Sequence, residues 1–145
     1  MSKTTTATTV NWDKQIERLI KHANKEAYTV SMQKVYDCES NVCFSEKHIK
    51  IHTGHTKERQ FYLLLHELGH MTLHKGRKGY SQTIEYAYNN FSDRSKANKV
   101  AHVEEEYKAW EEGYKIAKSK RLFIDRYNFQ KIKSECIQSY FIWAI

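Results

Sequence analysis

Leu63-Leu64-Leu65-His66-Glu67-Leu68-Gly69-His70-Met71 is an apolar run with a HExxH motif inside it. Two histidines four residues apart lie one helical turn apart, so both imidazoles can reach a single metal ion. Glu67 then flanks the ion, where its carboxylate can accept a proton from an activated water molecule. The pattern is typical of zinc-dependent hydrolases.

The helix that carries this motif is expected at residues 57–74, with Gly76 as its C-terminal stop. Its apolar residues are distributed all round the helix, which is the pattern of a buried helix. Burying two histidines and a glutamate without partners is costly, and a metal would satisfy all three. The alternative is a core helix whose histidines form hydrogen bonds with the backbone or with acidic side chains.

A catalytic zinc ion requires a third protein ligand and one open position. The pattern with a third histidine six residues after the second is absent, because Gly76 stands at that position. His74 lies two turns beyond His66, so a single ion held by His66 and His70 is hard for it to reach. We therefore interpret His74 as a residue that packs beside the ligands.

The third ligand is predicted in segment 100–114, which contains three consecutive glutamates. At about 100° per residue, Glu106 falls on the apolar face of this segment. Glu104 and Glu105 fall on the opposite face, where a solvated run of charge explains them. His102 shares the inward face with Glu106. It is a ligand, a partner of a ligand, an oxyanion donor or an ordinary helix histidine.

Together these residues resemble the small gluzincins of the ImmA/IrrE type and related metallopeptidases of phage and bacteria. The resemblance covers residues 49–117 and rests on two motifs, His66-Glu67-Leu68-Gly69-His70 and Glu106-Tyr107-Lys108-Ala109. Many family members also have a histidine at the position of His74. The family has an asparagine after Glu-x-x-Ala, whereas this chain has Trp110.

The resemblance implies an α+β fold of the minimal zincin type. Its elements would be an N-terminal helix, a small mixed sheet, the HExxH helix, a helix with the glutamate ligand and a C-terminal helix. It also implies zinc as the cofactor, with His66, His70 and Glu106 as ligands and Glu67 as the general base. Strand addition to an exposed edge strand, here 50–53, would bind an extended peptide. The alternative is an ordinary solvent-facing edge.

Hydrophobic periodicity predicts the same order of elements. The first helix is expected at 11–27, with Asn11 as its cap. A second is expected from Ser92 or Asp93 to 120, and one helix or a helical pair should follow after 121. Strands are expected at 28–36, 43–44 and 49–53. Ile49 and Ile51 would face the core. The apolar C-terminus should be buried against the core or a partner.

Two further details concern the surroundings of the motif. Gly69 has no side chain, so it would allow the backbone of a strand to approach closely. Any of Tyr80, Tyr86 and Tyr88 can donate a hydrogen bond to an oxyanion, with aromatic packing as the alternative.

Composition limits the class of protein. The 145 residues suffice for one domain with a modest core, expected at 10–145 after a disordered, threonine-rich lead-in at 1–9. The sequence has no apolar run of membrane-spanning length and no signal-like N-terminus, and its three cysteines suit a reducing compartment. A cytoplasmic protein without a membrane partner is expected, and a Cys38–Cys43 disulfide is only a minor alternative.

The formal net charge is +7, which would favour an acidic partner such as nucleic acid or an acidic protein. The lysines are spread along the chain, so a generally basic surface explains the charge equally well. The sequence does not indicate the oligomeric state.

The sequence thus predicts a zinc-dependent peptidase that acts on a specific, regulatory protein substrate. One alternative is a DNA-associated peptidase of the SprT type, although that group uses a third histidine. The other is a non-catalytic zinc-binding regulatory or interaction protein, which would not need the Glu67 carboxylate.

Overall fold

The computed structural model describes residues 9–34, 40–76 and 96–145. The helices and strands are α1 Trp12–Lys25, β1 Thr29–Gln33, β2 Asn41–Cys43, β3 His48–His52, α2 Lys57–Gly76, α4 Lys96–Ser119 and α5 Arg126–Ala144. This order confirms the predicted α+β class with a small mixed sheet. The start predicted for the glutamate helix, at Ser92 or Asp93, lies outside the described residues, as does the lead-in up to residue 8.

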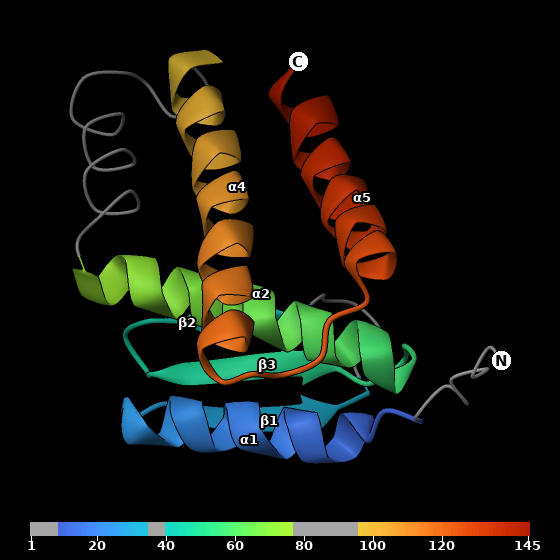
Figure 1. Ribbon diagram of the computed structural model, residues 1–145. Coiled ribbons are helices and arrows are strands. Elements are labelled where there is room, and N and C mark those ends of the chain that lie inside the picture. Colours follow the sequence, from blue (N-terminus) through green and yellow to red (C-terminus); the bar gives the residue numbers. More distant parts are fainter. Residues whose placement is uncertain (1–8, 35–39, 77–95) are drawn as a thin grey trace, which may run out of the picture.

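The three strands form one sheet in the order β1-β3-β2, with β1 parallel and β2 antiparallel to β3 (Figure 1). Ile49 and Ile51 of β3 are fully buried, as their alternation predicts. The prediction of an exposed edge at 50–53 is wrong, because β3 is the central strand and pairs on both sides. The outer strand beside α2 is β2, which contacts that helix.

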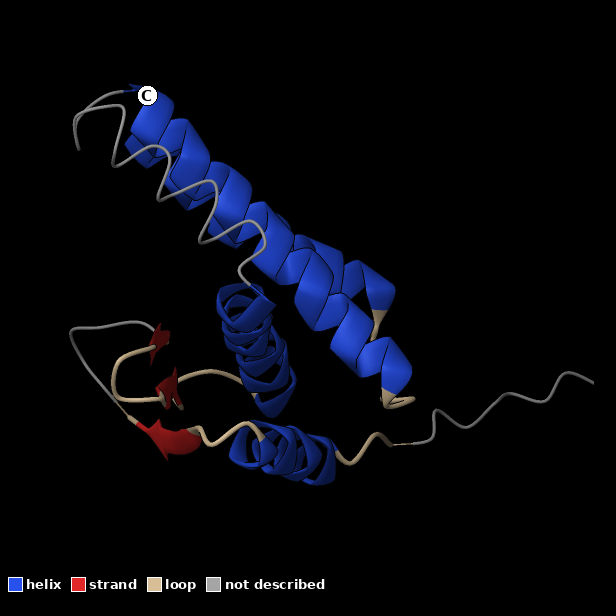
Figure 2. Ribbon diagram, turned by 90° about the vertical axis from the view of Figure 1, so that its left-hand side faces the viewer, coloured by secondary structure: helices blue, strands red, loops and turns tan. Residues whose placement is uncertain are grey.

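Helices α1 and α2 lie on the same side of the sheet, and α4 and α5 pack on the far side of α2 (Figure 2). Asn11 caps α1 as predicted, since its side-chain oxygen accepts a hydrogen bond from the backbone N–H of Lys14 at 3.0 Å. The apolar stripe of α1, Ile16, Leu19 and Ala23, joins the core that Ile49 and Ile51 of β3 share with α2.

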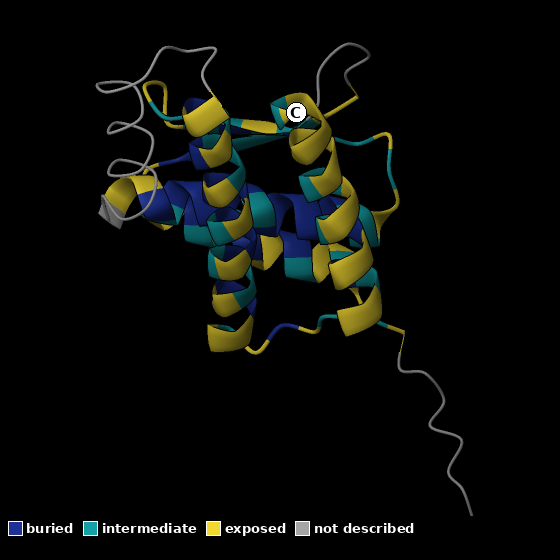
Figure 3. Ribbon diagram, turned by 90° about the horizontal axis from the view of Figure 1, so that it is seen from above, coloured by how far each residue is buried: buried dark blue, intermediate teal, exposed yellow. Residues whose placement is uncertain are grey.

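Helix α2 is the central element and contacts the sheet, α1 and α4. Figure 3 shows that most of its residues are buried. Its fully buried apolar residues are Phe61, Tyr62, Leu64, Leu65 and Leu68. The helix therefore owes its position to burial on nearly all sides, in agreement with its apolar sequence.

Two glycines allow α2 and α4 to cross at close distance. A Cβ atom at Gly69 would lie 1.9 Å from the carbonyl oxygen of Ala109, and one at Gly113 would lie 2.4 Å from that of Leu65. Neither helix tolerates a side chain at these positions without separating from the other. The backbone that approaches Gly69 belongs to a helix, not to the predicted strand.

Helix α5 forms a single helix that begins after Asp125, whose carboxylate accepts a hydrogen bond from the Asn128 N–H at 3.0 Å. Phe129 is buried near its start, whereas Phe141 and Ile145 are 60% and 85% exposed near its end. The C-terminus is not buried against the core, because α5 leaves the core after its first turns (Figure 1), and its burial against a partner stays a prediction.

Two smaller expectations concern membranes and disulfides. No helix among the described residues combines the length and apolar character that crossing a bilayer requires. Cys43 has a free thiol. Its suggested disulfide partner, Cys38, lies outside the described residues.

Candidate metal centre

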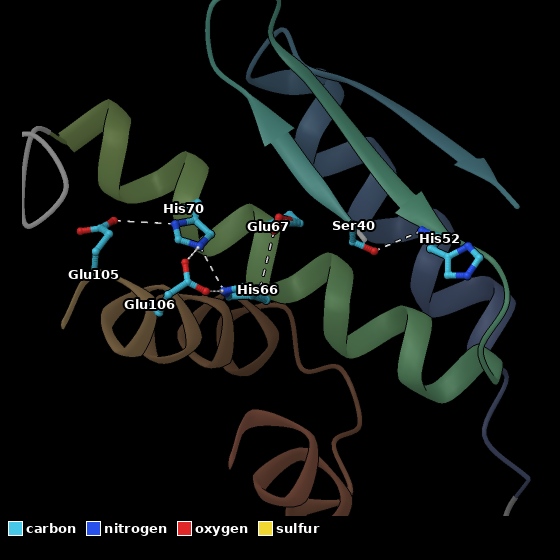
Figure 4. Close-up of polar contacts among 7 residues, drawn as sticks. All are labelled: Ser40, His52, His66, Glu67, His70, Glu105 and Glu106. Carbon is cyan, nitrogen blue, oxygen red and sulfur yellow. Dashed lines mark hydrogen bonds and ion pairs between the residues drawn. The ribbon is translucent and has the colours of Figure 1, made fainter. Parts of the chain in front are cut away.

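His66 and His70 project from the same side of α2, one turn apart, as their spacing predicts (Figure 4). Their Nε2 atoms are 3.1 Å apart, and their side chains are only 11% and 10% exposed. A neutral imidazole has one N–H, so two facing ring nitrogens satisfy each other only in part. Both nitrogens therefore lie where a shared metal ion would satisfy them.

Helix α4 brings the Glu106 carboxylate to these two nitrogens. Its Oε1 lies 3.0 Å from Nε2 of His66, and its Oε2 lies 2.7 Å from Nε2 of His70 (Figure 4). The Glu106 side chain is 8% exposed. The predicted third ligand thus lies beside the histidine pair, where the close crossing of α2 and α4 places it.

The donor set fits a zinc ion. Zinc binds imidazole nitrogen and carboxylate oxygen at about 2.0–2.2 Å, so donors around a tetrahedral ion lie about 3.3 Å apart. The separations of 3.1, 3.0 and 2.7 Å between the donors of His66, His70 and Glu106 are slightly shorter than this value. Small outward shifts of these side chains would therefore accommodate the ion.

The histidines and glutamates of this cluster shift one another's pKa. Burial alone would lower the pKa of His70, but contact with the Glu105 and Glu106 carboxylates raises it to about 10. Burial alone would raise the pKa of Glu106, but the two imidazoles beside it lower the pKa to about 2. The carboxylates therefore favour the protonated form of His70, and the imidazoles favour the ionised form of Glu106.

Glu67 lies beside the first histidine with a largely buried carboxylate. Its Oε1 is 3.7 Å from Nδ1 of His66, and its Oε2 is buried without a hydrogen-bond partner. Ligand atoms of His66, Glu67 and His70 all lie within 4.8 Å of one another. Burial raises the pKa of Glu67, and the Glu106 carboxylate adds to this rise while the two histidines oppose it. A carboxylate with a raised pKa is a stronger base than an exposed one.

Glu105 is not solvated as predicted. It is 2% exposed, and its Oε1 lies 3.7 Å from Nδ1 of His70 (Figure 4). The buried face of α4 includes Ala101, Glu105 and Ala109 as well as Glu106, so it is wider than the predicted stripe. The reason is that α2 lies closely along α4 at the glycine crossing and covers both glutamates.

Trp110, one residue after the predicted Glu-x-x-Ala motif, contacts the first histidine. Its indole is fully buried and stacks on the His66 ring, with centroids 4.4 Å apart and an angle of 7° between the planes. Flat stacking fixes the plane of an imidazole without forming a hydrogen bond to it. Here Trp110 therefore orients the first histidine by packing.

His74 and His102 lie further from the centre of the cluster. His74 is exposed and stacks on Phe44 at 4.1 Å, and His102 packs edge-on against Trp143 at 5.8 Å. Neither histidine is among the described residues that line the cleft beside the cluster. A role for them beside the ligands or as oxyanion donors stays a prediction. Tyr80, Tyr86 and Tyr88 lie outside the described residues.

A cleft of about 550 Å³ opens onto the cluster. Its walls come from β2 and its flanks, from α2, from Glu106 of α4 and from α5. The residues that α5 contributes are Glu135, Cys136, Ser139 and Tyr140. Arg59 of α2 and Glu135 of α5 form an ion pair of 3.3 Å at this wall. This role of α5 could not be predicted from the sequence, because no motif marks these residues.

Comparisons of the chain with protein-family models, with curated proteins and with solved structures found no significant match. The structure by itself thus establishes a buried His66-Glu67-His70 group on α2 with Glu105 and Glu106 of α4 beside it, which has the composition of a metal site.

Proposed function

We propose that this protein is a zinc-dependent peptidase of the gluzincin type that cleaves a specific, regulatory protein substrate. One observation carries the proposal: Nε2 of His66, Nε2 of His70 and the Glu106 carboxylate converge on one point, with Glu67 beside it. The resemblance of the two motifs to the ImmA/IrrE-type gluzincins supports the same function.

In this proposal His66, His70 and Glu106 hold the ion and the cleft admits the substrate. Zinc, when bound, is a Lewis acid that acidifies water and polarises a carbonyl group. Two imidazoles and one carboxylate leave a position open for these reactants, as in catalytic zinc sites. Trp110 and the surrounding apolar residues keep the ligands in place and exclude bulk water.

Glu67 serves as the general base. Its buried Oε2 has no hydrogen-bond partner and is therefore available to accept a proton from the attacking water. The same carboxyl group then delivers that proton to the leaving amine. A metal site with a purely structural role has no need of this carboxylate, so its position favours catalysis over a non-catalytic zinc-binding protein.

The outer strand β2 is the part of the sheet best placed to bind an extended peptide. Asn41 and Val42 line the cleft together with His66 and Glu67. Within the described sheet β2 pairs only with β3, so its other edge can add a substrate strand. This assignment replaces the expected edge at 50–53.

Metal content tests the ligand set. Mass spectrometry should find about one zinc per chain in the parent protein, and Glu106→Ala should lose most of it because two ligands hold zinc poorly. Glu104→Ala is the matched control, since Glu104 is 51% exposed and pairs with Lys108. Zinc retained in Glu106→Ala would assign the third ligand to another group, and a parent that binds no zinc would refute the proposal.

Turnover tests the base. With a peptide library as substrate and fragments detected by mass spectrometry, Glu67→Gln should retain zinc and lose at least about 100-fold in cleavage rate. Cleavage at the parental rate would exclude Glu67 as the base. Zinc binding without any cleavage by the parent would favour a non-catalytic regulatory protein.

The DNA-associated alternative has no specific support in the site. A salt-dependent gel shift with DNA would be the result in its favour.

A further inference from the structure

Glu105 is a buried carboxylate whose position the proposed ligand set does not explain. Its side chain is 2% exposed, and neither of its carboxylate oxygens has a hydrogen-bond partner. Leaving such a carboxylate buried costs stability unless a donor is close. The neighbouring Glu104, by contrast, is 51% exposed and forms an ordinary ion pair with Lys108.

The group beside Glu105 is the outer nitrogen of His70. Glu105 Oε1 lies 3.7 Å from Nδ1, while Nε2 on the opposite edge of the same ring points to Glu106 and His66. Glu105 and Glu106 are adjacent on α4 and differ by about 100° in direction, so they reach opposite edges of one imidazole. Figure 4 shows the ring between the two carboxylates.

We propose that Glu105 is a positioning residue that keeps a proton on Nδ1 of His70, so that Nε2 is the ring nitrogen that gives up its proton and binds the metal. This inference rests on the proposed metal centre. A neutral imidazole has one N–H, and the partner of one nitrogen decides which nitrogen carries it. A carboxylate near Nδ1 accepts a hydrogen bond from the Nδ1–H group, and this bond fixes the plane of the ring. A short side-chain movement would close the gap of 3.7 Å.

Zinc affinity, measured by competition with a chelator, tests the inference without any substrate. Glu105→Leu removes the acceptor but keeps a side chain of similar size, and should weaken zinc binding about 10–100-fold. Glu105→Gln retains a carbonyl oxygen that accepts the same hydrogen bond, so its affinity should stay within about threefold of the parent. Glu104→Leu, the matched control on the exposed face, should bind zinc like the parent.

Nitrogen NMR of the His70 ring provides a second readout, in which Glu105→Gln separates loss of the acceptor from a general loss of packing. In the zinc-loaded parent and in Glu105→Gln, Nδ1 should carry a proton that exchanges slowly with water. In Glu105→Leu that proton should exchange rapidly. Parental affinity in Glu105→Leu, or a rapidly exchanging Nδ1 proton in the parent, would overturn the inference.

Failure of this inference is separable from failure of the proposed function. If the parent binds about one zinc and Glu105→Leu binds it equally well, only the role of Glu105 is refuted. If the parent binds no zinc, the metal centre itself is refuted. If circular dichroism shows that Glu105→Leu does not fold, the exchange rate of the Nδ1 proton in the parent still tests the inference, because rapid exchange there would refute it.

Discussion

At the scale of single residues, the site depends on how α4 presents two consecutive glutamates. Glu106 contacts Nε2 of both histidines, whereas Glu105 lies beside Nδ1 of His70. In the proposed metal centre, Glu106 is therefore a ligand and Glu105 supports one. Trp110 supports the other ligand by stacking on His66. The two histidines are therefore held by different means, one by charge and one by an aromatic ring.

The charge on His70 leads to a pH-dependent affinity for zinc. Burial lowers the pKa of His70, but contact with Glu105 and Glu106 outweighs burial and raises it to about 10. At pH 7 the free site is therefore protonated, and zinc must displace that proton. Between pH 7 and 9 the affinity should rise about tenfold per pH unit, because below the pKa each pH unit raises the deprotonated fraction of His70 about tenfold.

Calorimetry in two buffers of different ionisation enthalpy measures this release directly. About one proton should leave per zinc bound at pH 8. An affinity that stays flat from pH 7 to 9, with no proton released, would show that His70 is already neutral in the free protein.

At the scale of elements, the crossing of α2 and α4 determines whether the ligands meet. The HExxH spacing on α2 aligns only the two histidines of the proposed centre, and Glu106 comes from α4, a separate helix. Contact between the two backbones at Gly69 and Gly113 sets the distance between the helices. Local periodicity assigned Glu106 to the inner face but missed Glu105, because the width of the covered face depends on this crossing.

Gly69→Ala tests the role of the crossing. The added methyl group would lie 1.9 Å from the Ala109 carbonyl oxygen, so α4 must move away from α2. We expect a loss of about 3 kcal/mol in the free energy of unfolding and a loss of zinc affinity, while helical content persists. Denaturant titration and chelator competition measure the two effects. Thr72→Ala, on the same helix, is the control and should change neither property substantially. Parental affinity in Gly69→Ala would show that the site tolerates a wider crossing.

At the scale of the whole molecule, the proposed centre joins two helices that are distant in sequence. His66 and His70 belong to α2, Glu106 belongs to α4, and α5 completes the cleft beside them. Only the folded chain brings these groups together. Zinc that binds the folded state alone must stabilise it against unfolding.

Thermal unfolding measures this coupling. Zinc at about a thousand times its Kd should add about 4 kcal/mol to the free energy of unfolding, which raises Tm by about 10 °C or more for a chain of this size. A chelator should reverse the rise, magnesium should not reproduce it, and Glu106→Ala should remove most of it. An equal rise in Glu106→Ala would place the stabilising ion at another site.

The sequence by itself determined the α+β class, the element order, the HExxH helix and the inward position of Glu106. These features follow from spacing along the chain, because helical and strand periodicities are local. Only the tertiary structure decided that β3 is central and β2 outer, that Glu105 is buried beside His70, and that α5 forms a wall of the cleft. These depend on which strands pair and how closely helices approach, and residues distant in sequence set both.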